Sequence, residues 1–272
     1  MCIRDRVNEK HHLGPSALGS LPVGMVSQFP LDYMHLVCLG VTRRLLLCWL
    51  KGPLCTRLCA RKVSELSERL TGFAAHVPRE FSRKLRSVAE VLRWKATEFR
   101  QFTLYTGIVA LSHILSDKLY KHFLVFSVAI SLLANPKVCS LYCDYANDLL
   151  CTFVNNALAL YGHEMMVYNV HGLVPLAEDV RKFGCLDNFS AFPFENAFMG
   201  LKKIIRKPNC ILQQIASRLS EQMSRGSHTV PKVTRTVGKK EHNMGPVPCG
   251  ILCINQYNDL YTDKFFSFCQ LQ

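Results

Sequence analysis

The sequence predicts a mostly α-helical protein with short β-strands near both ends. Apolar residues recur at three- and four-residue spacing through most of the stretch from 32 to 223, as one face of an amphipathic helix requires. Pro and Gly residues interrupt this stretch and divide it into separate helices. Hydrophobic residues make up 49% of the chain, which is enough to fill a core. We therefore expect a helical domain over 30–223.

Each expected helix ends at a recognisable break. The first begins at Asp32, buries Met34, Val37, Cys38, Val41, Leu45 and Trp49 on one face, and ends at Gly52-Pro53. Pro175 is expected to split the segment 164–183, because proline lacks an amide donor and clashes with the preceding turn. Further helices are expected over 56–74, 79–93, 95–116, 118–134, 139–162, 194–206 and 210–223.

The two ends of the chain lack this helical periodicity. Residues 1–6 resemble the translated end of a sequencing-library adapter, so we expect an artefact there and a chain that is a fragment. Gly and Pro residues over 7–29 indicate a loop leading into a short strand or turn. A basic linker is expected over 224–248, and weak alternation over 249–272 favours short strands at the start of a truncated C-terminal region.

The chain carries an excess of basic side chains. Its 33 Lys and Arg residues against 20 Asp and Glu give a formal net charge of +13, which indicates a polyanionic partner. Nucleic acid and an anionic membrane surface both fit this charge, and we favour nucleic acid. No apolar run reaches the about 20 residues that a membrane-spanning helix needs. The thirteen cysteines show no disulfide framework, which favours a reducing compartment.

Two acidic residues lie where helices are expected to begin. Asp32 begins the first helix, and Glu195 lies in the first turn of the 194–206 helix. A carboxylate at such a position accepts amide hydrogen bonds and suits the positive end of the helix dipole. It can also be a metal ligand that a rigid junction holds toward a cleft. Both interpretations stay open, and they are compatible.

Histidines and basic residues accompany these acids. His35 follows Asp32 by one helical turn, and His171 is a second candidate metal ligand, although a lone histidine in an apolar helix is more often a core residue. Lys95 and Arg100 are candidate DNA contacts. A basic cluster at i, i+1, i+4 and i+5 is expected to share one helix face, which meets phosphates or is merely solvated; its members are Lys202, Lys203, Arg206 and Lys207.

Four short motifs follow one another in a distinctive order. They are PLDYMHLVCLGV at 30–41, RWKATEFR at 93–100, YNVH at 168–171 and SAFPFEN at 190–196. Together they resemble animal CACTA (EnSpm)-type transposase-derived proteins over about residues 25–265. The resemblance implies an RNase H-like, DDE-type core that is interrupted by a mostly helical insertion, with 7–29 as a loop or the end of that core.

The resemblance also assigns roles to the two acids. It implies a triad of two aspartates and a glutamate, with Asp32 as the second aspartate, Glu195 as the closing glutamate and the first aspartate upstream of this chain. Such a set binds two Mg²⁺ ions about 3.5 to 4 Å apart for DNA strand cleavage and joining. The implied enzyme is a nuclear homo-oligomer, and the fragment alone is expected to be inactive. The alternative is a domesticated, non-catalytic DNA-binding protein or a helical interaction protein.

Overall fold

Helices make up most of the protein in the part that the structure describes, as the sequence predicts. The structure is a computed structural model that describes residues 22, 24, 28–78, 80–225, 240–242 and 256–257. The chain falls into two compact units, one from Met1–His76 and Arg83–Asn196 and the other from Val77–Ser82 and Ala197–Gln272. The helical stretch expected over 30–223 is therefore divided between the two units.

The first expected helix is present, but its first half is wound more widely than an α-helix. Residues Met34–Thr42 form a π-helix, η4, which continues directly into α1, Arg43–Lys51. The helix ends as expected at Gly52, whose amide donates to the carbonyl of Cys48 at 2.9 Å. The predicted apolar face is confirmed, because Met34, Val37, Cys38, Val41, Leu45 and Trp49 are all buried.

The next segment corrects one prediction. Helix α2 spans Ala60–Phe73, but the helix expected over 79–93 is wrong, since among its described residues, 80–93, only Val88–Arg93 is helical and forms a 3-10 helix, η5. Residues 84–87 before it have no regular secondary structure, and there the guanidinium of Arg86 donates to both carboxylate oxygens of Glu98, at 2.7 and 2.8 Å. The Arg86 side chain thus joins this segment to the next helix, which a periodic pattern does not reveal.

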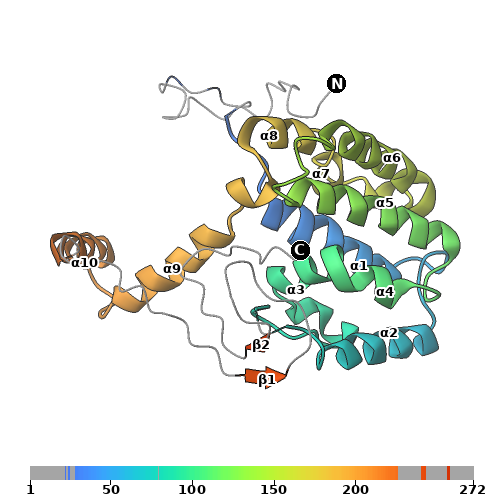
Figure 1. Ribbon diagram of the computed structural model, residues 1–272, viewed down its shortest axis with the longest axis horizontal. Helices are drawn as coiled ribbons and strands as arrows, with labels where there is room; N and C mark the ends of the chain where they lie inside the picture. The colour runs from blue at the N-terminus through green and yellow to red at the C-terminus, as the bar shows by residue number, and fades with distance from the viewer. Residues whose placement is uncertain are drawn as a thin grey trace. The chain divides into compact units, whose positions relative to one another are not determined.

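The centre of the first unit is built around two long antiparallel helices. Residues Ala96–Gln101 (α3), Phe102–Thr106 (η6, a π-helix) and Gly107–Leu111 (α4) lead into α5, Asp117–Ala134. Helix α5 packs along α6, Cys143–Tyr161 (Figure 1). Phe126 meets Phe153 across this interface with ring centroids 4.9 Å apart, and Phe123 meets Trp49 of α1 at 5.7 Å.

Short elements complete the first unit. They are η7 (His163–Met165), α7 (Tyr168–His171), α8 (Leu176–Phe183) and η8 (Leu186–Phe189). The predicted split at Pro175 is confirmed, because α7 ends before this residue and α8 begins directly after it. Helix α7 packs against η4 so closely that a Cβ added to Gly40 would lie 2.6 Å from Nδ2 of Asn169.

The boundary between the two units falls within helix α9. Helix α9, Phe192–Ile204, begins in the first unit, and α10, Ile211–Arg225, follows it. Two short segments, β1 (Lys240–His242) and β2 (Gln256–Tyr257), pair antiparallel. The expected artefact at 1–6 and most of 7–29, 224–248 and 249–272 lie outside the described residues. Within the described ranges, no helix is long and apolar enough to cross a bilayer.

Candidate functional site

Asp32 stands at the start of η4, and its carboxylate is surrounded by N–H donors. Oδ1 accepts from the amides of Met34 at 3.2 Å and Ala191 at 2.7 Å. Oδ2 accepts from the amide of His35 at 3.0 Å and makes a short contact with Nδ1 of the same residue. A carboxylate offers about four lone-pair positions. The expected capping role of Asp32 is therefore present, and it uses the whole acceptor capacity of the side chain.

Glu195 reaches the same place from the other end of the first unit. It lies in the first turn of α9, where the ring of Phe192 packs edge-on against Tyr33 with centroids 6.4 Å apart. Its Oε1 lies 3.6 Å from Nε2 of His35, which is an ion-pair distance if the imidazole is protonated and too long for a good hydrogen bond. His35 thus lies between Asp32 and Glu195, and both His35 and Glu195 are more than half exposed.

A buried aspartate that the sequence reasoning missed holds the chain just before Asp32. Asp179 of α8 is 0% exposed, and its Oδ2 accepts the amide of Leu31 at 2.9 Å, across 148 residues of sequence. The position of Asp179 in the first turn of α8 suggests an ordinary helix-start acid. Nothing in the local pattern points to Leu31, because that partner is tertiary.

Arg100 is mostly buried and pairs with an acid inside the protein. Its Nη2 donates to Oδ2 of Asp187 at 2.7 Å, and the Arg100 side chain is only 17% exposed. Burial raises the pKa of the Asp187 carboxyl, and the nearby charge of Arg100 opposes that rise. Burial also raises the pKa of the Cys38 thiol to about 12. This geometry gives Arg100 a structural partner inside the protein and leaves it poorly placed to meet a phosphate.

The second motif, RWKATEFR at 93–100, also contains Glu98, a buried carboxylate with structural contacts. Besides its paired contact with Arg86, Glu98 accepts the amide of Lys95 at 2.7 Å through Oε2. The Lys95 side chain itself is exposed, so it remains available to a partner. The YNVH motif meets the first motif through Asn169 and Gly40. In the described part of the chain, His171 makes no hydrogen bond or ion pair with Asp32, His35 or Glu195.

The basic cluster lies in the second unit, and one expectation about it is wrong. All four side chains are exposed, as a phosphate-binding surface requires. Helix α9, however, ends at Ile204, so Lys202 and Lys203 are helical whereas Arg206 and Lys207 lie in the turn that follows. The single helical face expected over 202–207 therefore becomes a helix end plus a turn. Pro208 explains the early stop together with Gln214, whose Oε1 accepts the amides of Arg206 and Lys207.

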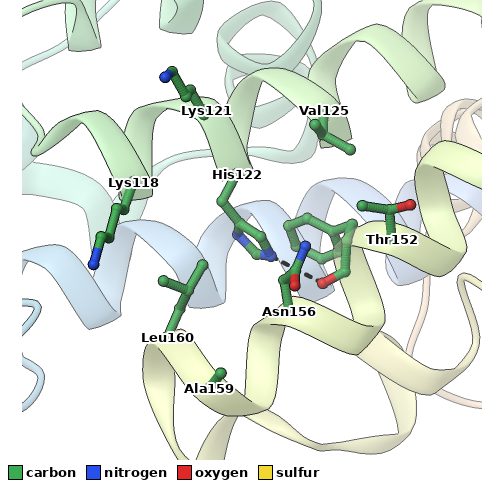
Figure 2. Close-up of a pocket in the computed structure, with 9 residues that line it drawn as sticks. Lys118, Lys121, His122, Val125, Thr152, Asn156, Ala159 and Leu160 are labelled. Carbon is green, nitrogen blue, oxygen red and sulfur yellow. Dashed lines mark hydrogen bonds between the residues drawn. The ribbon is translucent and has the colours of Figure 1, made fainter.

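The first unit also has a hollow between α5 and α6, with a volume of about 290 Å³ (Figure 2). His122 lines it and donates from Nε2 to the carbonyl of Phe153 at 2.9 Å. The imidazole also stacks on the Phe153 ring, with centroids 4.1 Å apart. Nδ1 of His122 is buried without a partner among the described residues. None of the predicted site residues lines this hollow. It is separate from the cluster formed by Asp32, His35 and Glu195.

The fit of the acidic cluster to magnesium is incomplete. Carboxylate oxygens are the ligands that Mg²⁺ prefers. Among the described residues, however, no group of three or more His, Cys, Asp and Glu side chains is arranged to hold a metal ion. His35 occupies Oδ2 of Asp32, and backbone amides occupy the rest of that carboxylate. The residues present do not by themselves form a two-metal centre.

Comparisons with known proteins add nothing to this geometry. No family model, curated protein or solved structure matches the chain. The resemblance therefore rests on the four ordered motifs, and a functional conclusion has to come from the arrangement of the residues.

Proposed function

We propose that this chain is part of a DNA-binding, DDE-type transposase-derived protein, and that its helices form the insertion of an RNase H-like core. The observation that best supports the proposal is the meeting of Asp32 and Glu195 at His35. These two acids come from the first and the last of the four motifs and are far apart in the sequence. A long helical stretch that returns to its starting point is what an insertion between two catalytic acids requires.

DNA as the partner is supported by charge and exposure. The chain carries a net charge of +13. The stretch 202–207 contains four basic residues and no acid; Lys202, Lys203, Arg206 and Lys207 are all exposed. Phosphate contacts from Lys and Arg supply most of the sequence-independent affinity for DNA. Lys95 is a further candidate contact. A nuclear location and a homo-oligomeric intact protein belong to the same proposal.

The catalytic form of this proposal needs two additions to the arrangement described. His35 has to turn away from Oδ2 of Asp32, and a third carboxylate has to come from outside the described residues. With both in place, Asp32 and Glu195 would be two of the ligands for Mg²⁺, which would supply the charge stabilisation for DNA strand cleavage and joining.

A second candidate, a domesticated DNA-binding protein without catalysis, is favoured by one observation. Every acceptor position of Asp32 is already taken by an N–H group of the protein. In this form the acids and His35 serve to join η4 to the start of α9, and the DNA-binding cluster is the functional surface.

Metal binding separates the two candidates. Mn²⁺, whose free ion is visible by electron paramagnetic resonance, is titrated into the chain and into Asp32→Asn, Glu195→Gln and Glu68→Gln variants. Glu68 is an exposed acid of α2 and serves as the control. The catalytic candidate predicts that the first two substitutions weaken binding about tenfold or more and that the control does not. Equal affinities for all four proteins reject the catalytic candidate.

DNA binding is tested by its salt dependence. Each phosphate contact contributes about −0.9 to the slope of log K against log salt. Lys202→Ala/Lys203→Ala is therefore expected to reduce the magnitude of the slope by about 2. The matched control, Lys118→Ala/Lys121→Ala, removes two exposed lysines of α5 and is expected to leave the slope unchanged. A chain that fails to bind duplex DNA at low salt, or equal slopes for the two double variants, overturns the DNA proposal.

A further inference from the structure

The turn between α9 and α10 is closed by one side chain, Gln214. Its Oε1 accepts the amides of Arg206 at 3.0 Å and Lys207 at 3.2 Å. Its Nε2 donates to the carbonyls of Lys207 at 2.9 Å and Asn209 at 2.6 Å. A side-chain amide offers two N–H donors and two acceptor lone pairs. The whole hydrogen-bonding capacity of Gln214 is thus spent on the backbone of this turn.

The turn has little else to hold its shape. Among the described residues, no backbone-to-backbone hydrogen bond involves residues 206–209. Pro208 has no amide to donate. Cys210 is held at φ 53°, in the left-handed region that residues other than glycine rarely adopt. Such a conformation persists only where neighbouring interactions enforce it. Gln214, in the first turn of α10, holds the backbone just before Cys210 through its side chain, and its amide donates to the Cys210 carbonyl at 3.0 Å.

The residues that Gln214 fixes are the two basic residues outside the helix. Arg206 and Lys207 follow Lys202 and Lys203 with no acid between them, and all four side chains are exposed. A backbone that is already ordered loses less conformational entropy when its side chains bind, which strengthens binding without a new contact. The two amides held by Oε1 belong to Arg206 and Lys207 themselves, so the attachment points of both side chains are fixed.

We infer that Gln214 is a positioning residue, and that the turn 205–210 is a preformed contact for the phosphate backbone of duplex DNA. The inference rests on the proposed DNA binding and adds to it the residue that shapes the surface. Gln214 does not touch the phosphates, because all of its polar hydrogens and lone pairs face the turn. It acts through Arg206 and Lys207.

The first arm of the test uses the free protein and needs no DNA. Hydrogen exchange at the amides of Arg206 and Lys207 is measured in the wild-type chain and in Gln214→Ala. Gln213→Ala is the matched control, because Gln213 is the preceding residue of α10, is exposed and makes no hydrogen bond through its side chain among the described residues. Gln214→Ala is expected to raise exchange at both amides about tenfold, and the control to leave it unchanged. Equal exchange in the two variants overturns the structural role of Gln214.

The second arm measures duplex DNA binding across a salt series. Gln214→Ala removes order but no charge, so about tenfold weaker binding with an unchanged log-log slope is expected. Lys207→Ala removes one phosphate contact and is expected to change the slope by about 0.9. Gln214→Glu keeps the acceptors, loses the two donors and is expected to weaken binding at least as much as Gln214→Ala.

The outcomes of this arm separate the inference from the proposed function. DNA binding by Gln214→Ala that equals that of Gln213→Ala overturns the inference alone. A wild-type chain that does not bind DNA at low salt overturns the proposed function and the phosphate role of the turn together, and the exchange measurement still reports on the turn itself.

Discussion

The amide of Ala191 donates to Oδ1 of Asp32 at 2.7 Å, across 159 residues of sequence. This single bond joins the residue before α9 to Asp32, which lies two residues before η4. Since Glu195 follows Ala191 by one turn of helix, its position next to His35 depends on the same bond. The position of Glu195 therefore depends on a hydrogen bond made by Asp32. Because Asp32 makes this bond and Glu195 does not, the two acids should contribute very differently to the stability of the fold.

Asp32→Ala is expected to destabilise the first unit by about 2 to 3 kcal/mol, because the amides of Met34, His35 and Ala191 lose their acceptor. Glu195→Ala is expected to change stability by less than about 0.5 kcal/mol, because the side chain is 58% exposed and its nearest partner atom is 3.6 Å away. Urea unfolding at pH 7 measures both. Similar losses for the two variants would contradict this division of roles.

Asp179→Ala is expected to destabilise the protein by about 2 kcal/mol, since the half-buried amide of Leu31 would lose its carboxylate acceptor. Exchange at the Leu31 amide should rise with it. Glu178→Ala, an exposed neighbour in the same helical turn, is the control and should stay within about 0.5 kcal/mol of the wild-type chain. Slow exchange at Leu31 in Asp179→Ala would show that another group holds this segment.

Local patterns predicted the helices well where the cause of the structure is local. The apolar spacing from Met34 to Trp49 marks a buried face, and Pro175 breaks a helix by its own chemistry. The helix predicted over 79–93 was wrong because the Arg86 side chain pairs with Glu98. The helix end at Ile204 was missed because the residues after it are hydrogen-bonded to Gln214.

The same division applies to the candidate site. The motif order singled out Asp32 and Glu195, and the one-turn spacing singled out His35. The sequence did not reveal that His35 lies between the two acids or that Asp179 anchors Leu31, because both contacts join residues that are more than a hundred positions apart. Arg100 looked like a surface base, and only its pairing with Asp187 shows that it is held inside the fold.

Gly40→Ala is expected to destabilise the protein by about 2 kcal/mol, because its Cβ would lie 2.6 Å from Nδ2 of Asn169 and 2.8 Å from the carbonyl oxygen of His35. Gly172→Ala should cost less, since its Cβ meets the flexible end of Leu36. Gly72→Ala, in α2, meets nothing within 4 Å and should stabilise the helix by about 0.5 kcal/mol.

Urea unfolding of the three glycine variants checks this order. Adding Asn169→Ala to Gly40→Ala should recover part of the loss, because one of the two close contacts is then removed. No recovery would mean that the carbonyl of His35 alone sets the limit. A neutral Gly40→Ala would show that α7 and η4 do not pack as tightly as described.

The unfolding free energy should fall as the pH is lowered from about 7 to 5, and His122 should account for part of that fall. Burial lowers the pKa of His122 below 6.5, and its hydrogen bond to the Phe153 carbonyl only partly opposes this. Because the folded state holds the neutral imidazole, protons bind preferentially to the unfolded chain below about pH 6.5. The stability contributed above that pH is lost as the pH falls, with a slope of at most about 1.4 kcal/mol per pH unit for one proton.

Replacing His122 with Phe removes the titrating group while keeping an aromatic ring against Phe153. The unfolding free energy of His122→Phe should therefore vary less between pH 7 and 5 than that of the wild-type chain. Lys118 and Lys121, which line the same hollow, are present in both proteins. His163→Gln removes an exposed imidazole and should keep the wild-type slope. A wild-type slope in His122→Phe would place the responsible proton on another group.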